Sequence, residues 1–186
     1  GVFEVAALGI PPGLGSHVHW DRRLVARLLA AVGSIPAVKG VEIGPALENS
    51  ARRGTEVHDE IFEEDGALVR GTNRAGGFEG GITTGQPVIV RAAMKPISTT
   101  LTPLRSVDLA SGEPARTRYE RSDTCAVPRA AVVGEAMVAY VMADALLEKL
   151  GGDSLDEMGP RLGALRRGML KELEMDNEPW RFAGSA

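Results

Sequence analysis

A chain of 186 residues is long enough for one domain with a substantial hydrophobic core. Its formal net charge of −4 and its pI near 5.5 argue against a general nucleic-acid or membrane-surface binder. Cys125 is the only cysteine, which excludes an internal disulfide framework and favours the cytosol.

The first residues show no basic segment of the kind that opens a signal peptide. They predict a strand over residues 2–8 that runs into a turn at Pro11, Pro12 and Gly13. Because the chain lacks an initiator methionine and opens on a strand, we expect it to be a piece of a longer chain. No run reaches the roughly 18 uncharged apolar residues typical of a membrane span.

The next elements alternate between helix and strand. Asp21 is expected to cap a helix that carries Leu24, Leu28 and Ala31 on one face. An apolar strand is predicted over residues 38–44, followed by a polar loop over residues 45–54 and a short segment with His58, Asp59 and Glu60.

Residues 71–85 have the oddest composition, with six glycines in fifteen positions. Glycine allows a positive φ and has no side chain, so such a loop can bring its backbone close to a ligand. No G-x-G-x-x-G lies between a strand and a helix, so the loop does not fit a dinucleotide fingerprint. Without further information, a mobile surface loop is favoured over a ligand cover.

A strand over residues 87–94 ends at a group of polar residues. Lys95, Ser98, Thr99 and Thr100 place one cation and three hydroxyls after the strand, which indicates a phosphate cradle. A hairpin turn is predicted over residues 110–114.

The chain is organised around a long apolar helix that begins at Pro128 and stops at Gly151 and Gly152. Apolar residues surround this helix, so we expect burial along most of its length. A non-helical approach precedes it and contains Arg121, Asp123 and Cys125. An amphipathic helix over residues 156–175 and a polar tail complete the chain.

Several residues allow both a functional and a structural interpretation. His17 and His19 could bind a metal, but no third ligand follows at a suitable spacing, so hydrogen-bonding turn histidines are favoured. The His58 segment could be catalytic, although a solvated helix start is favoured. Cys125 has no sequence-adjacent base and is better explained as a packed residue than as a nucleophile. Arg121 and Asp123 fit a structural ion pair and a functional pair equally well. These residues alone indicate an anion-binding α+β domain of uncertain activity.

Seven motifs in order resemble one family. The segment RSDTCAVPRAAVVGEAM resembles the C-terminal motif of chorismate synthase, in which Arg-x-Asp-x-Cys is followed by a spaced Glu. The other motifs are PPGLGSHVHWDRRL, KGVEIG, TEVHDEI, TNRAGGFEGGITTGQP, VRAAMKPISTT and VDLASGEP. The resemblance covers residues 1 to about 152 and is highly specific.

The resemblance implies an α+β fold, the second half of a β-α-β sandwich with an antiparallel sheet packed on long central helices. Residues 1–152 would be the C-terminal half of the enzyme domain, and residues 153–186 a C-terminal helix and tail. It further implies an anti-1,4-elimination that converts 5-enolpyruvylshikimate 3-phosphate into chorismate and phosphate with reduced FMN. Members are cytoplasmic homotetramers of about twice this length, and the family is associated with NADP.

The resemblance also implies roles for individual residues. Asp123 resembles the acid that relays a proton to or from flavin N5, and Arg121 the arginine that touches flavin and substrate. The flavin-binding segment corresponds to Lys95, Pro96, Ile97, Ser98 and Thr99, and the flavin-contacting glycine to Gly80. The family's Asn-Ala or Gln-Ala pair is Pro36-Ala37 here, which leaves only a backbone contact.

The family's two catalytic histidines lie in its N-terminal half and do not correspond to His17, His19 or His58. We therefore expect the chain to be inactive without that half and to expose an apolar patch. A second hypothesis is a non-catalytic module for flavin or phosphate binding or for assembly. A flavin oxidoreductase is disfavoured because no nicotinamide fingerprint is visible.

Overall fold

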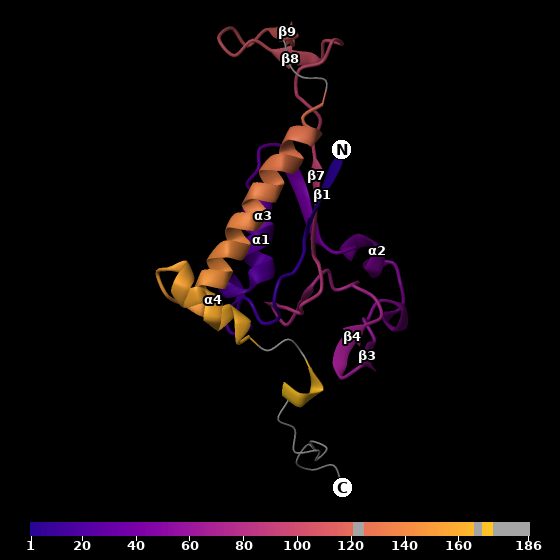
Figure 1. Ribbon diagram of the computed structural model, residues 1–186. Coiled ribbons are helices and arrows are strands. Elements are labelled where there is room, and N and C mark those ends of the chain that lie inside the picture. The colour runs from indigo at the N-terminus through magenta and orange to yellow at the C-terminus, as the bar shows by residue number, and fades with distance from the viewer. Residues whose placement is uncertain (121–124, 166–168, 173–186) are drawn as a thin grey trace.

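The computed structural model describes residues 1–120, 125–165 and 169–172. Its centre is a three-stranded antiparallel sheet in the order β1 (Val2–Ala7), β7 (Val88–Met94), β2 (Val38–Ile43). Helices α1 (Leu24–Gly33) and α3 (Val127–Leu150) lie side by side against one face of this sheet (Figure 1). This arrangement confirms the predicted α+β class with an antiparallel sheet packed on helices.

The core lies between the sheet and the two helices. Phe3 and Val5 alternate along β1 toward the helices, as the two-residue period of a strand requires. Helix α1 contributes Leu24, Leu28 and Val32 to this core, and the three side chains are fully buried at helical spacing. The predicted strands and the apolar face of α1 are therefore confirmed.

The predicted Asp21 cap is wrong. Asp21 belongs to a short 3-10 helix, η1 (Trp20–Arg22), and the residue that caps α1 is Arg23, whose side chain makes no capping bond. The N–H of Leu24 instead donates to the carbonyl oxygen of Gly81 at 3.0 Å. A distant loop thus supplies the acceptor that the local sequence was expected to provide.

Helix α3 begins with Pro128 in its first turn and ends at Gly151, which has φ 61°. Burial along most of its length is wrong, because only one face packs against β1 and α1. An apolar stripe remains exposed at heptad spacing, comprising Val133, Ala136, Tyr140, Ala143 and Leu147. By length and composition α3 could cross a membrane, a test that core helices also pass.

Shorter elements lie outside the central sheet. Helix α2 (Ala46–Ser50) replaces part of the predicted polar loop, and the N–H of Leu47 donates to Glu42 Oε2 at 2.8 Å. A short 3-10 helix, η2 (Gly54–Glu56), precedes the hairpin of β3 (Ile61–Glu64) and β4 (Ala67–Arg70). Strands β5 (Phe78–Glu79) and β6 (Ile82–Thr83) form a second hairpin inside the glycine-rich segment.

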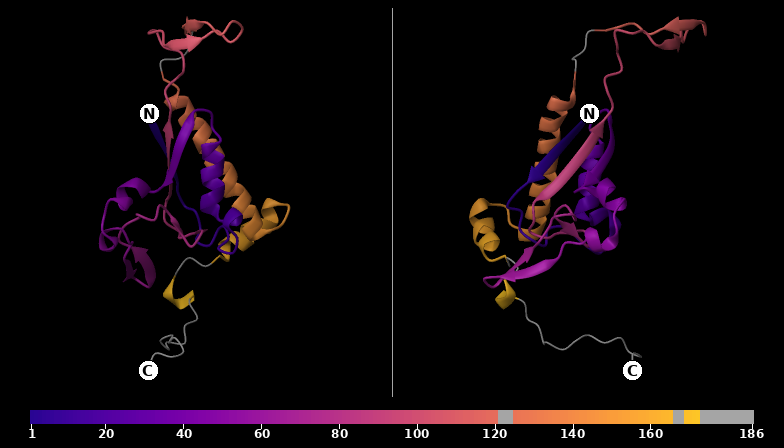
Figure 2. Two further views of the ribbon diagram at one scale, coloured as in Figure 1. Left: turned by 180° about the vertical axis from the view of Figure 1, so that it is seen from behind. Right: turned by 90° about the vertical axis from the view of Figure 1, so that its right-hand side faces the viewer.

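The predicted hairpin turn at residues 110–114 is confirmed. It joins β8 (Arg105–Val107) to β9 (Pro114–Arg116), and the pair projects beyond the ends of β7 and α3 (Figure 2). Asp108 accepts hydrogen bonds from the N–H groups of Ala110 and Ser111 and so closes the turn.

The C-terminal helix is shorter than expected. Helix α4 (Leu155–Gly163) is capped by Ser154, whose side chain accepts the N–H of Glu157 at 3.3 Å. Among the described residues after it, a 3-10 turn, η3 (Leu170–Glu172), is the one further helical element. Helix α4 contacts the end of α3, where Arg161 Nη1 donates to the carbonyl oxygen of Leu150 at 3.0 Å. The predicted boundary at Gly152 stays a prediction.

Candidate functional site

Two of the predicted cofactor segments meet at the C-terminal end of β7. The N–H of Lys95 donates to the carbonyl oxygen of Ala37 at 2.8 Å. Pro36 and Ala37 follow the C-terminus of α1, and their side chains, like that of Lys95, are exposed. The fold therefore joins segments almost sixty positions apart into one exposed edge.

Ala37 has a φ of 67°, the left-handed region that alanine rarely adopts. Among the described residues only Asp65 shares this property without being glycine. Such a conformation persists where surrounding contacts impose it, and here the bond from Lys95 is one such contact.

The rest of the phosphate-cradle segment continues along the same edge. Ser98 is exposed and Ile97 and Thr99 are half-buried. Thr99 Oγ1 donates to the carbonyl oxygen of Glu120 at 3.4 Å, which brings residues 95–99 beside the approach to the Arg-x-Asp-x-Cys motif. Arg121 and Asp123 themselves lie outside the described residues, whereas Cys125 is exposed at the start of α3.

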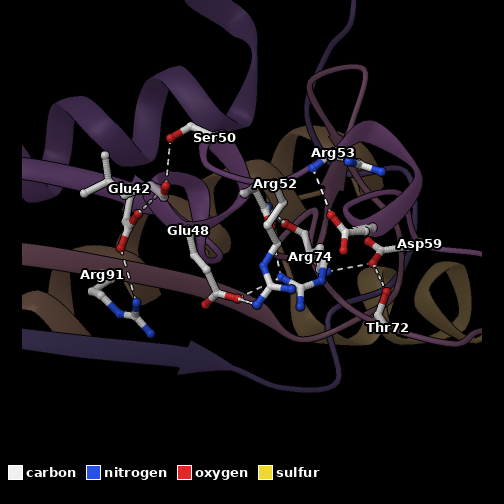
Figure 3. A network of polar contacts seen from close by, with 12 residues as sticks. Glu42, Glu48, Ser50, Arg52, Arg53, Asp59, Thr72, Arg74 and Arg91 are labelled. Atoms are coloured by element: carbon white, nitrogen blue, oxygen red, sulfur yellow. Dashed lines mark hydrogen bonds and ion pairs between the residues drawn. The ribbon is translucent and has the colours of Figure 1, made fainter.

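The glycine-rich segment is anchored by Asp59 (Figure 3). The Asp59 carboxylate accepts the hydroxyl of Thr72, the N–H of Arg74 at 2.7 Å and the N–H of Ala75 at 2.9 Å. Partial burial opposes its charged form, but these hydrogen bonds and the charge of Arg70 outweigh that effect and lower the pKa of Asp59. The favoured solvated helix start is wrong, because His58, Asp59 and Glu60 lie in a non-helical stretch between η2 and β3. These contacts give Asp59 a structural role, and its catalytic interpretation stays a hypothesis.

Asn73 also fixes the glycine-rich segment, through bonds to Gly77 and Pro87. Its Oδ1 accepts the N–H of Gly77 at 2.9 Å, and its Nδ2 donates to the carbonyl oxygen of Pro87 at 2.8 Å. Gly76 and Gly77 are buried so tightly that an added Cβ would come within 3.0 Å of neighbouring backbone. These contacts favour a preformed loop over the predicted mobile one.

A network of ion pairs continues from this anchor toward the sheet. Arg74 Nη1 reaches Glu48 Oε1 and Asn49 Oδ1, both at 3.1 Å. The hydrogen bond from Arg74 and then that from Arg52 lower the pKa of Glu48. On the sheet itself, Arg91 lies between Glu4 and Glu42 across three paired strands. Sequence patterning offered no signal for the contacts of Arg74 and Arg91, since their partners lie 25 to 87 positions away along the chain.

The last predicted cofactor residue, Gly80, stands apart from the others. It occupies the turn between β5 and β6, is exposed, and has φ 60° with nothing within 4 Å of an added Cβ. It does not approach Pro36, Ala37 or Lys95, because β5–β6 lies at the opposite end of β7. The structure thus brings together two of the three described cofactor segments.

A cavity of about 230 Å³ lies on the open face of the sheet, and none of the described site residues lines it. Its lining consists of Val2, Gly40, Val41, Glu42, Leu47, Arg91 and Ala93. The histidines show no metal site: His17, His19 and His58 are exposed, and the described part of the chain holds no cluster of three His, Cys, Asp or Glu side chains suited to a metal.

Known proteins resemble the chain over most of its length. The sequence profile described as chorismate synthase matches residues 1–147. A chorismate synthase of Saccharopolyspora erythraea is 60% identical over 159 residues, covering 84% of this chain and 40% of the relative. One of Rubrobacter xylanophilus is 61% identical over 158 residues, covering 85% of this chain and 41% of the relative.

A solved structure leads to the same family. The chain superposes on a crystal structure of chorismate synthase with a TM-score of 0.73 and 50% identity, covering 88% of this chain and 42% of the other. The chain thus spans about 40% of the length of the curated relatives it matches. Profile, relatives and superposition agree that this chain belongs to the chorismate synthase family.

Proposed function

We propose that this chain is the part of a chorismate synthase that supplies Asp123, Arg121, residues 95–99 and Gly80 to a site for reduced FMN. Family membership supports the assignment of the reaction. The observation that carries the site is the hydrogen bond from Lys95 to Ala37, which brings two of the proposed flavin segments together.

The proposed reaction is the loss of phosphate and of one ring proton from 5-enolpyruvylshikimate 3-phosphate. A C–O bond to phosphate breaks, a C–H bond releases its proton, and a new C=C bond forms, so chorismate results with no net oxidation or reduction. Bound reduced FMN would supply electron density while phosphate leaves, and that density would return to it with the ring proton.

The residues at the 95–99 edge fit a group that carries phosphate. Lys95 offers an exposed ammonium and Ser98 an exposed side chain with a hydroxyl, whereas the hydroxyl of the half-buried Thr99 donates to the carbonyl oxygen of Glu120. Cations and hydroxyls are the side chains that bind phosphate oxygens well. Pro36 and Ala37 would contribute backbone to the flat ring, since neither carries a polar side chain. Asp123 would hold the proton in transit and Arg121 would orient flavin and substrate.

The remaining part of the enzyme is the proposed partner of α3. The exposed stripe of Val133, Ala136, Tyr140, Ala143 and Leu147 has the heptad spacing with which helices pack together. An apolar stripe of this kind indicates an interaction surface. We propose that helices of the N-terminal half cover it, within a cytoplasmic homotetramer.

Anaerobic phosphate release from 5-enolpyruvylshikimate 3-phosphate with reduced FMN tests the proposal. We expect no release from residues 1–186 alone, because the general-acid histidines are missing. We expect release from a completed chain, in which the remaining part of the S. erythraea relative is fused to the N-terminus of residues 1–186. Equal activity of the two proteins would contradict the inactivity of the part. If neither protein releases phosphate, the result would favour the alternative, a non-catalytic module for flavin binding, phosphate binding or assembly.

A further inference from the structure

A two-pronged ion pair holds the residue that precedes Gly80. Arg70 Nη1 donates to Glu79 Oε1 at 3.0 Å, and Arg70 Nη2 donates to Glu79 Oε2 at 2.8 Å. Arg70 is the last residue of β4 and Glu79 the last residue of β5, so the pair ties two hairpins together. Two parallel bonds between a guanidinium and a carboxylate fix the orientation of both groups as well as their separation.

The turn around Gly80 is held separately on its two sides. Strands β5 and β6 have two residues each, and so short a hairpin needs support from outside itself. On the β6 side, the buried Thr83 bonds to the segment before α1, and the carbonyl oxygen of Gly81 accepts the first N–H of α1 at 3.0 Å. On the β5 side, the Glu79 carboxylate is tied to Arg70. The ion pair therefore supports the side of the turn that the contacts of β6 do not reach.

The pair also neutralises a carboxylate beside an open turn. Gly80 has φ 60° and nothing within 4 Å of an added Cβ, so its peptide groups are accessible. Reduced FMN and the proposed substrate both carry phosphate, and an unpaired carboxylate on the neighbouring Glu79 would repel them. The guanidinium of Arg70 cancels that charge and remains protonated at any pH at which the protein is folded. Only 17% of the Arg70 side chain is exposed, so solvent screens this pair less than it screens an open surface pair.

We infer that Arg70 is a positioning residue of the flavin site, which acts through Glu79 to hold the Gly80 turn in place and to keep it neutral toward anions. This inference rests on the proposed contact between Gly80 and the flavin. It assigns a task to a pair of side chains that the sequence motifs did not single out.

Three variants of the completed chain test the inference through the dissociation constant of reduced FMN, titrated under anaerobic conditions. Arg70→Gln leaves the Glu79 carboxylate unpaired beside the turn, so binding should weaken about tenfold. Glu79→Gln loses the two-pronged bond together with the negative charge, so binding should weaken only about threefold. The double variant has no unpaired charge and should bind about threefold more tightly than Arg70→Gln alone.

The salt dependence of binding separates the electrostatic role from a merely structural one. Raising the KCl concentration from about 50 mM to about 500 mM should narrow the gap between Arg70→Gln and the double variant, because salt screens the exposed carboxylate. Circular dichroism and urea unfolding verify that every variant is folded, so the affinities compare folded proteins.

Glu4→Gln is the matched control. Glu4 pairs with Arg91 at 2.8 Å, the same distance as the closer Arg70–Glu79 bond, and its side chain is 44% exposed against 51% for Glu79. This pair spans the central sheet instead of supporting the glycine-rich segment, so Glu4→Gln should bind reduced FMN as the wild type does.

Two results would overturn the positioning role and leave the proposed function intact. One is a flavin affinity of Arg70→Gln equal to that of Glu4→Gln, and the other is a double variant that binds no better than Arg70→Gln. A wild-type completed chain that neither binds reduced FMN nor releases phosphate would instead count against the proposed function.

Discussion

The N–H of Lys95 donates to the carbonyl oxygen of Ala37 at 2.8 Å, and Ala37 holds a φ of 67°. Both residues lie just beyond the bulge at which the register between β2 and β7 shifts, between Val38 and Gly40. A strained residue is therefore built into the edge that carries the proposed flavin segments.

Ala37→Val should weaken this edge. A β-branched residue is far less tolerant of a positive φ than alanine, so we expect a loss of about 1–2 kcal/mol in the free energy of unfolding. Ala37→Gly is the control, because glycine adopts this conformation without strain, and it should be as stable as the wild type within about 1 kcal/mol. Urea unfolding of the completed chain and fluorescence titration with FMN measure both effects. Equal stability of the two variants would show that the left-handed conformation is not maintained in solution.

Asp59→Asn should destabilise the protein in a pH-dependent manner. Asparagine removes a charged acceptor for three donors, and hydrogen bonds to a charged group contribute about 1.5–3 kcal/mol. Because folding lowers the pKa of Asp59 below its ordinary value of 3.8, the stabilisation is complete above that pH and is lost as the pH falls through the lowered value. The difference between wild type and variant should therefore be constant from pH 7 to pH 5 and shrink below pH 4.

Asp108→Asn is a control for that experiment. Asp108 also accepts backbone N–H groups, those of Ser111 and then Ala110 being the main causes of its lowered pKa. The Asp108 turn is exposed and projects from the body of the protein. Replacing Asp108 should therefore lower the free energy of unfolding less than replacing Asp59 does. Urea midpoints from pH 3 to pH 7 check both variants, and an equal loss for both would contradict the anchoring role of Asp59.

Gly134→Ala should separate α3 from β1. An added Cβ would lie 2.5 Å from the buried ring of Phe3, so the ring or the helix must move. Overpacking of this kind costs about 1–3 kcal/mol. Gly163→Ala in α4 has open space around it and should be neutral or stabilising by up to about 1 kcal/mol. Thermal unfolding compares the pair, and two equal melting temperatures would argue against the close contact between Gly134 and Phe3.

Tyr140→Glu should reduce self-association of residues 1–186. Tyr140 is 72% exposed in the middle of the α3 stripe, and a carboxylate there disfavours burial against another apolar surface. In the completed chain the same change should impair assembly and phosphate release at least tenfold. Leu155→Glu, at a residue 82% exposed on α4, is the control and should alter neither property. Analytical ultracentrifugation follows association, and unchanged association of Tyr140→Glu would exclude the stripe as the contact surface.

Local sequence determined most of the secondary structure. The strand ahead of the Pro11-Pro12-Gly13 turn, the spacing of Leu24 and Leu28 in α1, and the Pro128 start and glycine stop of α3 were predicted correctly. Each depends on side-chain periodicity or backbone preference within one segment, which belongs to that segment whatever surrounds it. The motifs likewise identified the family, because their residues and their order are properties of the sequence alone.

Tertiary structure decided which groups bond to the helix ends, which distant residues pair and which helix faces are buried. The first N–H of α1 bonds to the carbonyl oxygen of Gly81 rather than to Asp21, α2 forms where a loop was predicted, and one face of the apolar α3 stays exposed. Asp59 became a loop anchor because its partners lie thirteen to sixteen positions away, beyond the reach of local patterns. Above all, only the path of β7 placed Lys95 beside Ala37 and far from Gly80. Sequence order records which residues are neighbours along the chain, whereas the antiparallel register of a sheet decides which of them meet in space.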